Sequence, residues 1–244
     1  GQIVDTNSAW IGAQFSALGV KLHEIISCGD DGLQIISALE RAKGTSQIVL
    51  MTGGLGPTKD DITKKTLVEY FNTELELNEE VWERMVKIFE SRGKEVLEMN
   101  RSQAMIPKDC LMLPNMRGTA QGMWFEKQEV VFISLPGVPH EMKHLMETQV
   151  LPKLKERFEF PKIIHKTMMT AGAGESVIAN KLKEVEEQLP AHIKLAYLPN
   201  LGVVKLRLTG SGEGGKLRRE IEEHKEKMKA VLGELVYTEG EDSL

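Results

Sequence analysis

The chain has 244 residues and a mass of 27.3 kDa, enough for one large domain or for one medium and one small domain. Apolar residues make up 41% of it, so the chain can bury a packed core. Its 31 basic and 36 acidic residues give a net charge of −5, which argues against charge-driven nucleic-acid binding. No apolar run reaches the roughly 18 residues of a membrane-spanning helix, and no signal peptide is visible. We therefore expect a cytoplasmic protein with no membrane partner.

The first 160 residues alternate between strand and helix patterns. Apolar periodicity predicts helices over 6–18, 32–43, 78–92 and about 139–157, and strands over 20–27, 47–51, 122–126 and 129–134. This alternation is typical of a parallel sheet with crossover helices, and the turn at 127–128 adds an antiparallel hairpin. We predict an α/β fold in which a mostly parallel sheet carries helices on both faces.

The remaining residues predict a second, smaller unit. Strand patterns at 164–170, 193–198, 203–208 and 235–237 alternate with helix patterns at 175–188 and 215–232. A boundary is expected around Pro161. The predicted domains are residues 1–160 and residues 163–244, the second of them a small α+β module.

The strongest local feature is the loop TGGLGPTKDD at 52–61, which follows a predicted strand and enters a predicted helix. Glycines allow positive φ and close approach, so backbone N–H groups of this loop can point at an anion, assisted by the helix dipole. Asp60 and Asp61 would repel a bare phosphate, and a divalent metal ion between carboxylate and phosphate removes that conflict. The alternative is a purely structural turn in which Asp61 caps the helix.

Two further glycine-bearing turns follow predicted strands, LPGVP at 135–139 and GDDG at 29–32. Open α/β sheets bind ligands at the carboxyl ends of their strands, so the three turns together predict an anionic-ligand site with room for a metal. Each also has a structural alternative. Pro139 suits the first turn of a helix, and either Asp30 or Asp31 can cap the helix that follows.

Two polar stretches, 100–103 and 114–120, are predicted to be loop segments in otherwise apolar surroundings. The guanidinium of Arg101 could bind a phosphate in a forked arrangement, or both segments could be surface turns. The histidines show no metal-ligand spacing beyond His140 and His144, which we interpret as one face of a helix.

Six segments together resemble the competence/damage-inducible CinA family, in the same order and over nearly the whole chain. They are GQIVDTNSAW (1–10), TGGLGPTKDD (52–61), NRSQA (100–104), LPNMRGTAQG (113–122), LPGVPHEM (135–142) and LAYLPNLGVVKLRLTG (195–210). The first domain is also similar to the MogA/MoaB molybdopterin-binding fold, where TGGTG and LPG turns occur in the same order.

The resemblance implies that residues 1–160 form the family's nucleotide-pyrophosphate domain, associated with metal-dependent ADP-ribose pyrophosphatase activity. The second domain would be its KH-like middle module. Family members usually begin with a strand and an acidic turn, and many end in a nicotinamide-nucleotide amidase. This sequence shows neither, so we do not expect amidase activity.

Carried over residue by residue, the resemblance implies a site at the turns. Asp61 matches the acidic residue that ends the TGG loop, and Asp30 matches that of the earlier turn, so the two are the expected metal ligands. The expected substrate-binding residues are Thr52, Gly53, Gly54 and Gly56 as a phosphate cradle, Pro136 and Gly137 as the other wall, and Asn7 and Ser8 beside them at a helix start.

The first hypothesis is a metal-dependent hydrolase of a nucleoside diphosphate sugar, with ADP-ribose as the expected substrate. Asp30 and Asp61 would hold a divalent ion that activates the water, and Asp60 is a candidate base. The alternative is a molybdopterin or nucleotide-binding protein without hydrolase activity. The second module lacks a clear GxxG loop and basic face for RNA, so we expect it to build a homodimer.

Overall fold

The computed structural model describes residues 4–91, 93–212 and 214–239. The chain divides into two compact units, one made of residues 1–12 and 22–159, the other of residues 13–21 and 160–244. None of the helices in the described ranges combines the length and hydropathy needed to cross a lipid bilayer.

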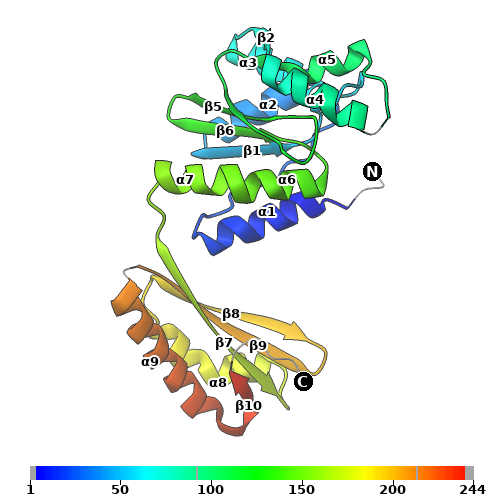
Figure 1. Cartoon of the computed structure of the whole chain (residues 1–244). Helices are drawn as coiled ribbons and strands as arrows, with labels where there is room; N and C mark the ends of the chain where they lie inside the picture. Colours follow the sequence, from blue (N-terminus) through cyan, green and yellow to red (C-terminus); the bar gives the residue numbers. More distant parts are fainter. Residues whose placement is uncertain (1–3, 92, 213, 240–244) are drawn as a thin grey trace. The chain divides into compact units, whose positions relative to one another are not determined.

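The first unit contains a four-stranded sheet with the order β1-β6-β5-β4 (Figure 1). Its strands are β1 (Ile48–Thr52), β4 (Leu111–Leu113), β5 (Gly122–Lys127) and β6 (Val130–Leu135). Strands β1 and β6 are parallel, whereas β5 is antiparallel to both of its neighbours. The predicted α/β fold is confirmed, and its sheet is mixed rather than dominated by parallel pairs.

The β5–β6 hairpin turns one residue later than predicted. Gln128 and Glu129 occupy the turn with φ of 52° and 65°. Two successive residues of positive φ are typical of a type I′ turn, whose twist matches that of the flanking strands. Neither residue is glycine or asparagine, so the residue types typical of a type I′ turn are missing, and only the flanking strand patterns indicate the hairpin.

Helices cover both faces of the sheet, as predicted. On one face α2 (Gly32–Lys43) and α3 (Thr63–Phe71) bury Leu39 and Leu67 against β5 and β6. On the other face, in Figure 1, α6 (Pro139–Leu145) continues through a π-helical turn (Met146–Val150) into α7 (Leu151–Arg157). This run confirms the predicted helix 139–157. The π turn lies beside Pro152, which has no N–H for the regular ladder.

Three more helices and a small two-stranded sheet complete the elements before residue 160. They are α1 (Thr6–Ala17), α4 (Glu79–Ser91), α5 (Glu98–Ala104), β2 (Leu75–Leu77) and β3 (Met105–Pro107). The expectation that residues 100–103 form a loop is wrong, because they lie on α5. The Asn100 side chain accepts a hydrogen bond from the Leu97 N–H, and Gln103 is buried, so polar contacts hold this short helix in place of an apolar stripe.

The predicted strand at 20–27 is wrong. Residues 20–29 form neither helix nor strand, and Leu22 and Ile25 are 45% and 53% exposed. A strand is stable when a neighbouring strand pairs with its N–H and C=O groups, and none of the described strands pairs with this segment. The sequence predicts that the turn at 29–32 follows a strand of the sheet. This prediction is wrong, because none of the described residues before the turn lies in a strand.

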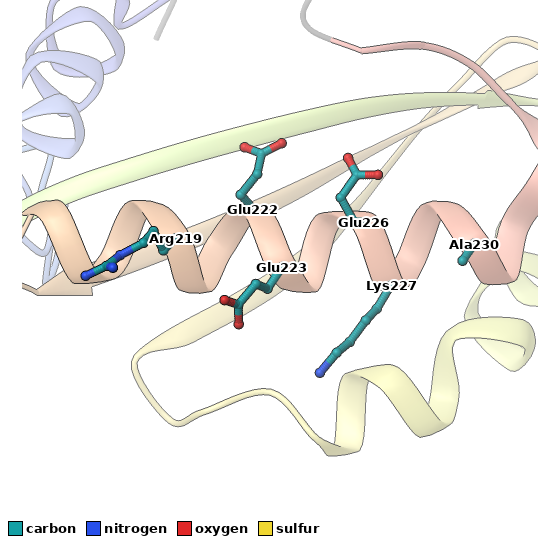
Figure 2. Close-up of a pocket in the computed structure, with 6 residues that line it drawn as sticks. All are labelled: Arg219, Glu222, Glu223, Glu226, Lys227 and Ala230. Atoms are coloured by element: carbon teal, nitrogen blue, oxygen red, sulfur yellow. The ribbon is translucent and has the colours of Figure 1, made fainter.

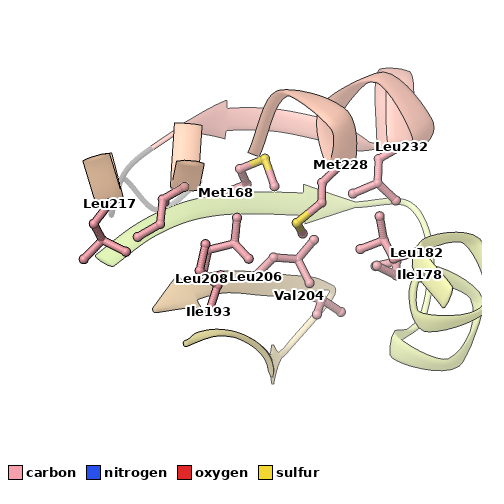
Figure 3. Packing of buried hydrophobic residues seen from close by; sticks show 11 residues of the cluster. Met168, Ile178, Leu182, Ile193, Val204, Leu206, Leu208, Leu217, Met228 and Leu232 are labelled. Atoms are coloured by element: carbon pink, nitrogen blue, oxygen red, sulfur yellow. The ribbon is translucent and has the colours of Figure 1, made fainter. Parts of the chain in front are cut away.

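The second unit is an antiparallel sheet of order β10-β7-β9-β8 packed against two helices. Its elements are β7 (Lys162–Ala171), α8 (Glu175–Glu187), β8 (Ile193–Asn200), β9 (Val203–Gly212), α9 (Gly214–Leu232), a 3-10 turn (Gly233–Leu235) and β10 (Val236–Glu239). Figure 3 shows its core, where Met168 and Leu206 of the sheet meet Ile178 and Met228 of the helices. Every element predicted for this module is present.

Candidate functional site

Two of the three glycine turns meet at one edge of the first sheet. Thr52 at the end of β1 is the register partner of Leu135 at the end of β6. The Gly53 N–H donates to the Leu135 carbonyl at 2.9 Å, and a Cβ on Gly137 would lie 3.2 Å from the Gly53 Cα. A side chain on Gly137 would be crowded at this distance, so glycine favours the approach of the two turns. The predicted contact between these turns is therefore present.

The loop after β1 folds back onto the first turn of α3. Gly53 and Gly54 have φ of 104° and 66°, values that favour glycine. A Cβ on Gly54 would overlap the Thr63 hydroxyl, and the Thr63 N–H donates to the Gly54 carbonyl at 3.2 Å. The loop is thus fixed to the helix that begins at Thr63.

The backbone donors of this loop divide into two groups. The N–H groups of Gly53 and Thr58 already have intramolecular acceptors, and that of Gly56 is directed to Asp61. Those of Gly54 and Leu55 donate to no acceptor within the described part of the chain. The N–H groups left to bind an anion are therefore those of Gly54 and Leu55, and not those of Gly53 and Gly56, which were predicted as part of the cradle.

Asp61 closes the loop on itself. Its Oδ2 accepts from the Thr58 N–H at 2.9 Å and from the Thr58 hydroxyl at 2.6 Å. Burial acts to raise the pKa of Asp61, but hydrogen bonds from Thr58 and the Gly56 N–H outweigh it, so the pKa lies below its ordinary value. Asp61 does not cap α3, since the residue at the N-cap is Ile62 without a side-chain hydrogen bond.

Because folding lowers the pKa of Asp61, its carboxylate stabilises the fold only while it is charged. This contribution is complete above the ordinary aspartate pKa of about 3.9 and is lost as pH falls through the lowered value. We expect the difference in unfolding free energy between wild type and Asp61→Asn to be constant above about pH 5 and to shrink below about pH 4. Urea titrations of the metal-free proteins measure it, and a difference independent of pH would contradict the assignment.

Asn7, on the first turn of α1, joins the two turns. Its Nδ2 donates to the Gly137 carbonyl at 2.9 Å and lies 3.5 Å from the Thr52 hydroxyl. Its Oδ1 is buried and accepts no hydrogen bond from any described residue. Ser8 serves the helix start instead, because its N–H donates to Asp5 Oδ1 at 2.9 Å.

No contact in the described ranges brings Asp30 or Arg101 to these turns, and Asp60 belongs to the 52–61 loop itself. Asp30 and Asp60 are exposed, and Asp31 caps α2 by accepting from the Gln34 N–H at 2.9 Å. Arg101 is exposed on α5. Within the described residues, no group of three histidine, cysteine or acidic side chains is placed to hold a metal ion.

A polar network was missed by the sequence analysis. It joins Glu141, on α6, to the buried side chains of Asn115 and Gln121 in the loop between β4 and β5. The segments NRSQA and PNMRGTAQ contain most of its members, so their run of amides was the available signal.

Figure 2 shows a groove along α9 in the second unit, lined by Arg219, Glu222, Glu223, Glu226, Lys227 and Ala230. Glu222 pairs with Lys166 and with Lys225, and Glu226 lies 3.6 Å from Lys225. The residues that line the groove all belong to α9 and recur at helical spacing. The groove is thus a charged face of α9, and its lining residues do not form a catalytic site.

Two family models match the chain. Residues 1–156 match the probable molybdopterin binding domain, and residues 165–238 match the KH domain of damage-inducible protein CinA. The chain belongs to the CinA-like family. A CinA-like protein of Flavobacterium psychrophilum is 45% identical over 99% of this chain, and one of Cytophaga hutchinsonii is 46% identical over 100% of it.

The chain spans 58% and 59% of the length of these two CinA-like relatives. Among solved structures, the CinA protein of Thermoplasma acidophilum superposes on 65% of this chain and 90% of its own, with a TM-score of 0.56 and 30% identity. The function of that protein is described as unknown. The comparisons therefore confirm the family and the molybdopterin-binding-type fold of the first unit.

Proposed function

We propose that the first unit hydrolyses the pyrophosphate bond of a nucleoside diphosphate sugar, with ADP-ribose as substrate. The observation that carries this proposal is the contact between Gly53 and Gly137 at the shared edge of β1 and β6. It brings two glycine turns together at the carboxyl ends of two parallel strands, the edge at which α/β sheets bind ligands.

In this proposal the N–H groups of Gly54 and Leu55 bind phosphate oxygens at the start of α3. They are preorganised, because the loop is fixed by Thr63 and by the hydrogen bonds to Asp61. Donors that need no reorganisation stabilise the charge that develops as water attacks phosphorus. Asn7 holds the two turns together through the Gly137 carbonyl.

A divalent cation fits the donor set in a limited way. Mg²⁺ commonly takes one or two carboxylates from a protein and the remaining ligands from water and substrate phosphates. Asp61 and its neighbour Asp60 would supply those carboxylates, whereas no contact in the described ranges brings Asp30 to this loop. The ion would neutralise charge on the diphosphate and activate water.

The direct test is incubation of the protein with ADP-ribose and Mg²⁺ or Mn²⁺. We expect AMP and ribose 5-phosphate in equal amounts, detected by chromatography, and no products with a chelator present. Substrate that stays intact with every divalent ion would overturn the hydrolase proposal.

The second candidate is binding or transfer of molybdopterin or its adenylylated form without hydrolysis. The family model for residues 1–156, a probable molybdopterin binding domain, favours it. The same glycine turns would hold the ligand's phosphate. Tight molybdopterin binding together with intact ADP-ribose would support this candidate over the first.

We propose that the second module contributes no group to the chemistry, because both glycine turns, together with Asp60 and Asp61, precede residue 142. We also propose that this module builds a homodimer. For a chain cut after Phe160, we expect hydrolysis per folded molecule to be retained and the dimer to be lost. Activity assays and light scattering measure the two effects. A folded monomer without activity would mean that the module completes the site.

A further inference from the structure

The loop between β4 and β5 is closed around one buried side chain. Asn115 is completely buried, and its Nδ2 donates to the Ala120 carbonyl at 2.9 Å. Its Oδ1 accepts from the Arg117 N–H at 3.0 Å, and its own N–H donates to Gln121 Oε1 at 2.8 Å. Every polar group of the Asn115 side chain is therefore used to shape residues 115–121.

Glu141 fastens this loop to α6. Asn115 Nδ2 also donates to Glu141 Oε2 at 2.6 Å, a short charge-assisted hydrogen bond. A Cβ on Gly118 would overlap the Glu141 carboxylate, so the carboxylate lies directly against the loop backbone. Glu141 stands on the first turn of α6, four residues after Gly137.

Two other helices hold the opposite side of the same loop. Gln103 of α5 donates through Nε2 to the Thr119 hydroxyl at 2.8 Å, and Arg84 of α4 donates to Gln121 Oε1 at 3.0 Å. A loop anchored to three helices is rigid without ligand. The cost of ordering it on binding is therefore small.

The outer part of the loop lies at the surface, where the Met116 sulfur accepts a hydrogen bond from Arg84 at 2.9 Å. Met116 is 66% exposed, and the side chain of Arg117 is exposed while its N–H is held by Asn115. A guanidinium forks well onto phosphate oxygens. The Glu141 carboxylate would repel an anion, so it does not itself bind one; its contact is with Asn115 of the loop.

We propose that Glu141 is a positioning residue, which latches residues 115–121 beside the Gly137 turn so that Arg117 binds the anionic ligand held by the Gly54 loop. The inference deepens the proposed function and rests on its anion site. It assigns a task to two sequence segments, NRSQA and PNMRGTAQ, that the phosphate cradle leaves unexplained.

The test uses the full chain, with magnesium pyrophosphate as the probe in calorimetry and amide hydrogen exchange over residues 113–122. We expect Glu141→Ala and Gly118→Ala each to speed exchange and to weaken pyrophosphate binding about tenfold, since each removes the same charged hydrogen bond. The double variant should be no worse than either single one. Arg117→Ala should weaken pyrophosphate binding by the same factor and leave amide hydrogen exchange over residues 113–122 unchanged.

Glu141→Gln keeps an acceptor for Asn115 and should stay near wild type, which separates the hydrogen bond from a general loss of folding. Glu147→Ala, an exposed glutamate of the adjoining π-helical turn, is the matched control. Unchanged exchange in Glu141→Ala overturns the latch. Faster exchange with unchanged pyrophosphate affinity overturns the loop as a wall of the site.

The outcomes also distinguish this inference from the proposed function. Wild type that binds pyrophosphate but leaves ADP-ribose intact refutes the hydrolase and still decides the role of Glu141. If the wild-type protein binds neither pyrophosphate nor ADP-ribose, both the anion site and this inference are refuted.

Discussion

Replacing Gly54 with valine is expected to lower the free energy of unfolding by at least about 2 kcal/mol, because a β-branched residue is strained at positive φ. Gly54 has φ of 66°, and a side chain there would also overlap Thr63 at the start of α3. The loop must move to relieve the overlap, so the N–H groups of Gly54 and Leu55 lose their placement. We expect pyrophosphate binding to fall by a factor of ten or more.

Gly174→Val is the matched control for this change. Gly174 has φ of −75°, and a Cβ there would meet no atom within 4 Å, so valine is neither strained nor crowded at this position. Because Gly174 is the N-cap of α8, where valine is a poor cap, we expect a loss of only about 1 kcal/mol and unchanged pyrophosphate binding. Urea denaturation and calorimetry measure the two effects. A Gly54→Val protein that binds pyrophosphate like wild type would show that the loop is not the cradle.

Asp61→Asn is expected to keep the fold and to remove most metal-dependent turnover of ADP-ribose. The amide keeps the shape and can still accept the Thr58 N–H, but it loses the charge that would hold a cation. The loss should be partly reversed by a higher Mg²⁺ concentration, since the phosphates still bind the ion. Steady-state rates across a Mg²⁺ series measure this, with circular dichroism as the check on folding.

Two further variants separate a metal ligand from a residue that only closes the loop. Thr58→Val removes the hydroxyl that donates to Asp61, so it perturbs the loop and leaves the carboxylate charge in place. Asp109→Asn removes an exposed charge elsewhere in the unit. If Thr58→Val loses as much turnover as Asp61→Asn, and neither responds to Mg²⁺, Asp61 acts through loop structure alone.

Local sequence patterns were enough to predict most elements and the two glycine turns. Apolar periodicity is a local property, so it located α2, α4, the helix from Pro139 to Arg157 and every element of the second unit. The turns at Gly53 and Gly137 were predicted because their glycines follow strand patterns directly. Pairing β1 with β6 then brings them together.

Features that depend on contacts between residues far apart in the sequence could not be predicted from local patterns. The segment 20–27 has a strand pattern but no paired strand, and the short helix α5 is held by polar contacts that no periodicity reveals. Two further features come from the folded chain. Asp61 does not cap α3, and Glu141 contacts Asn115, which lies 26 positions before it in the sequence. A side-chain hydrogen bond needs its donor and acceptor at a set distance and angle, and only the folded backbone provides these.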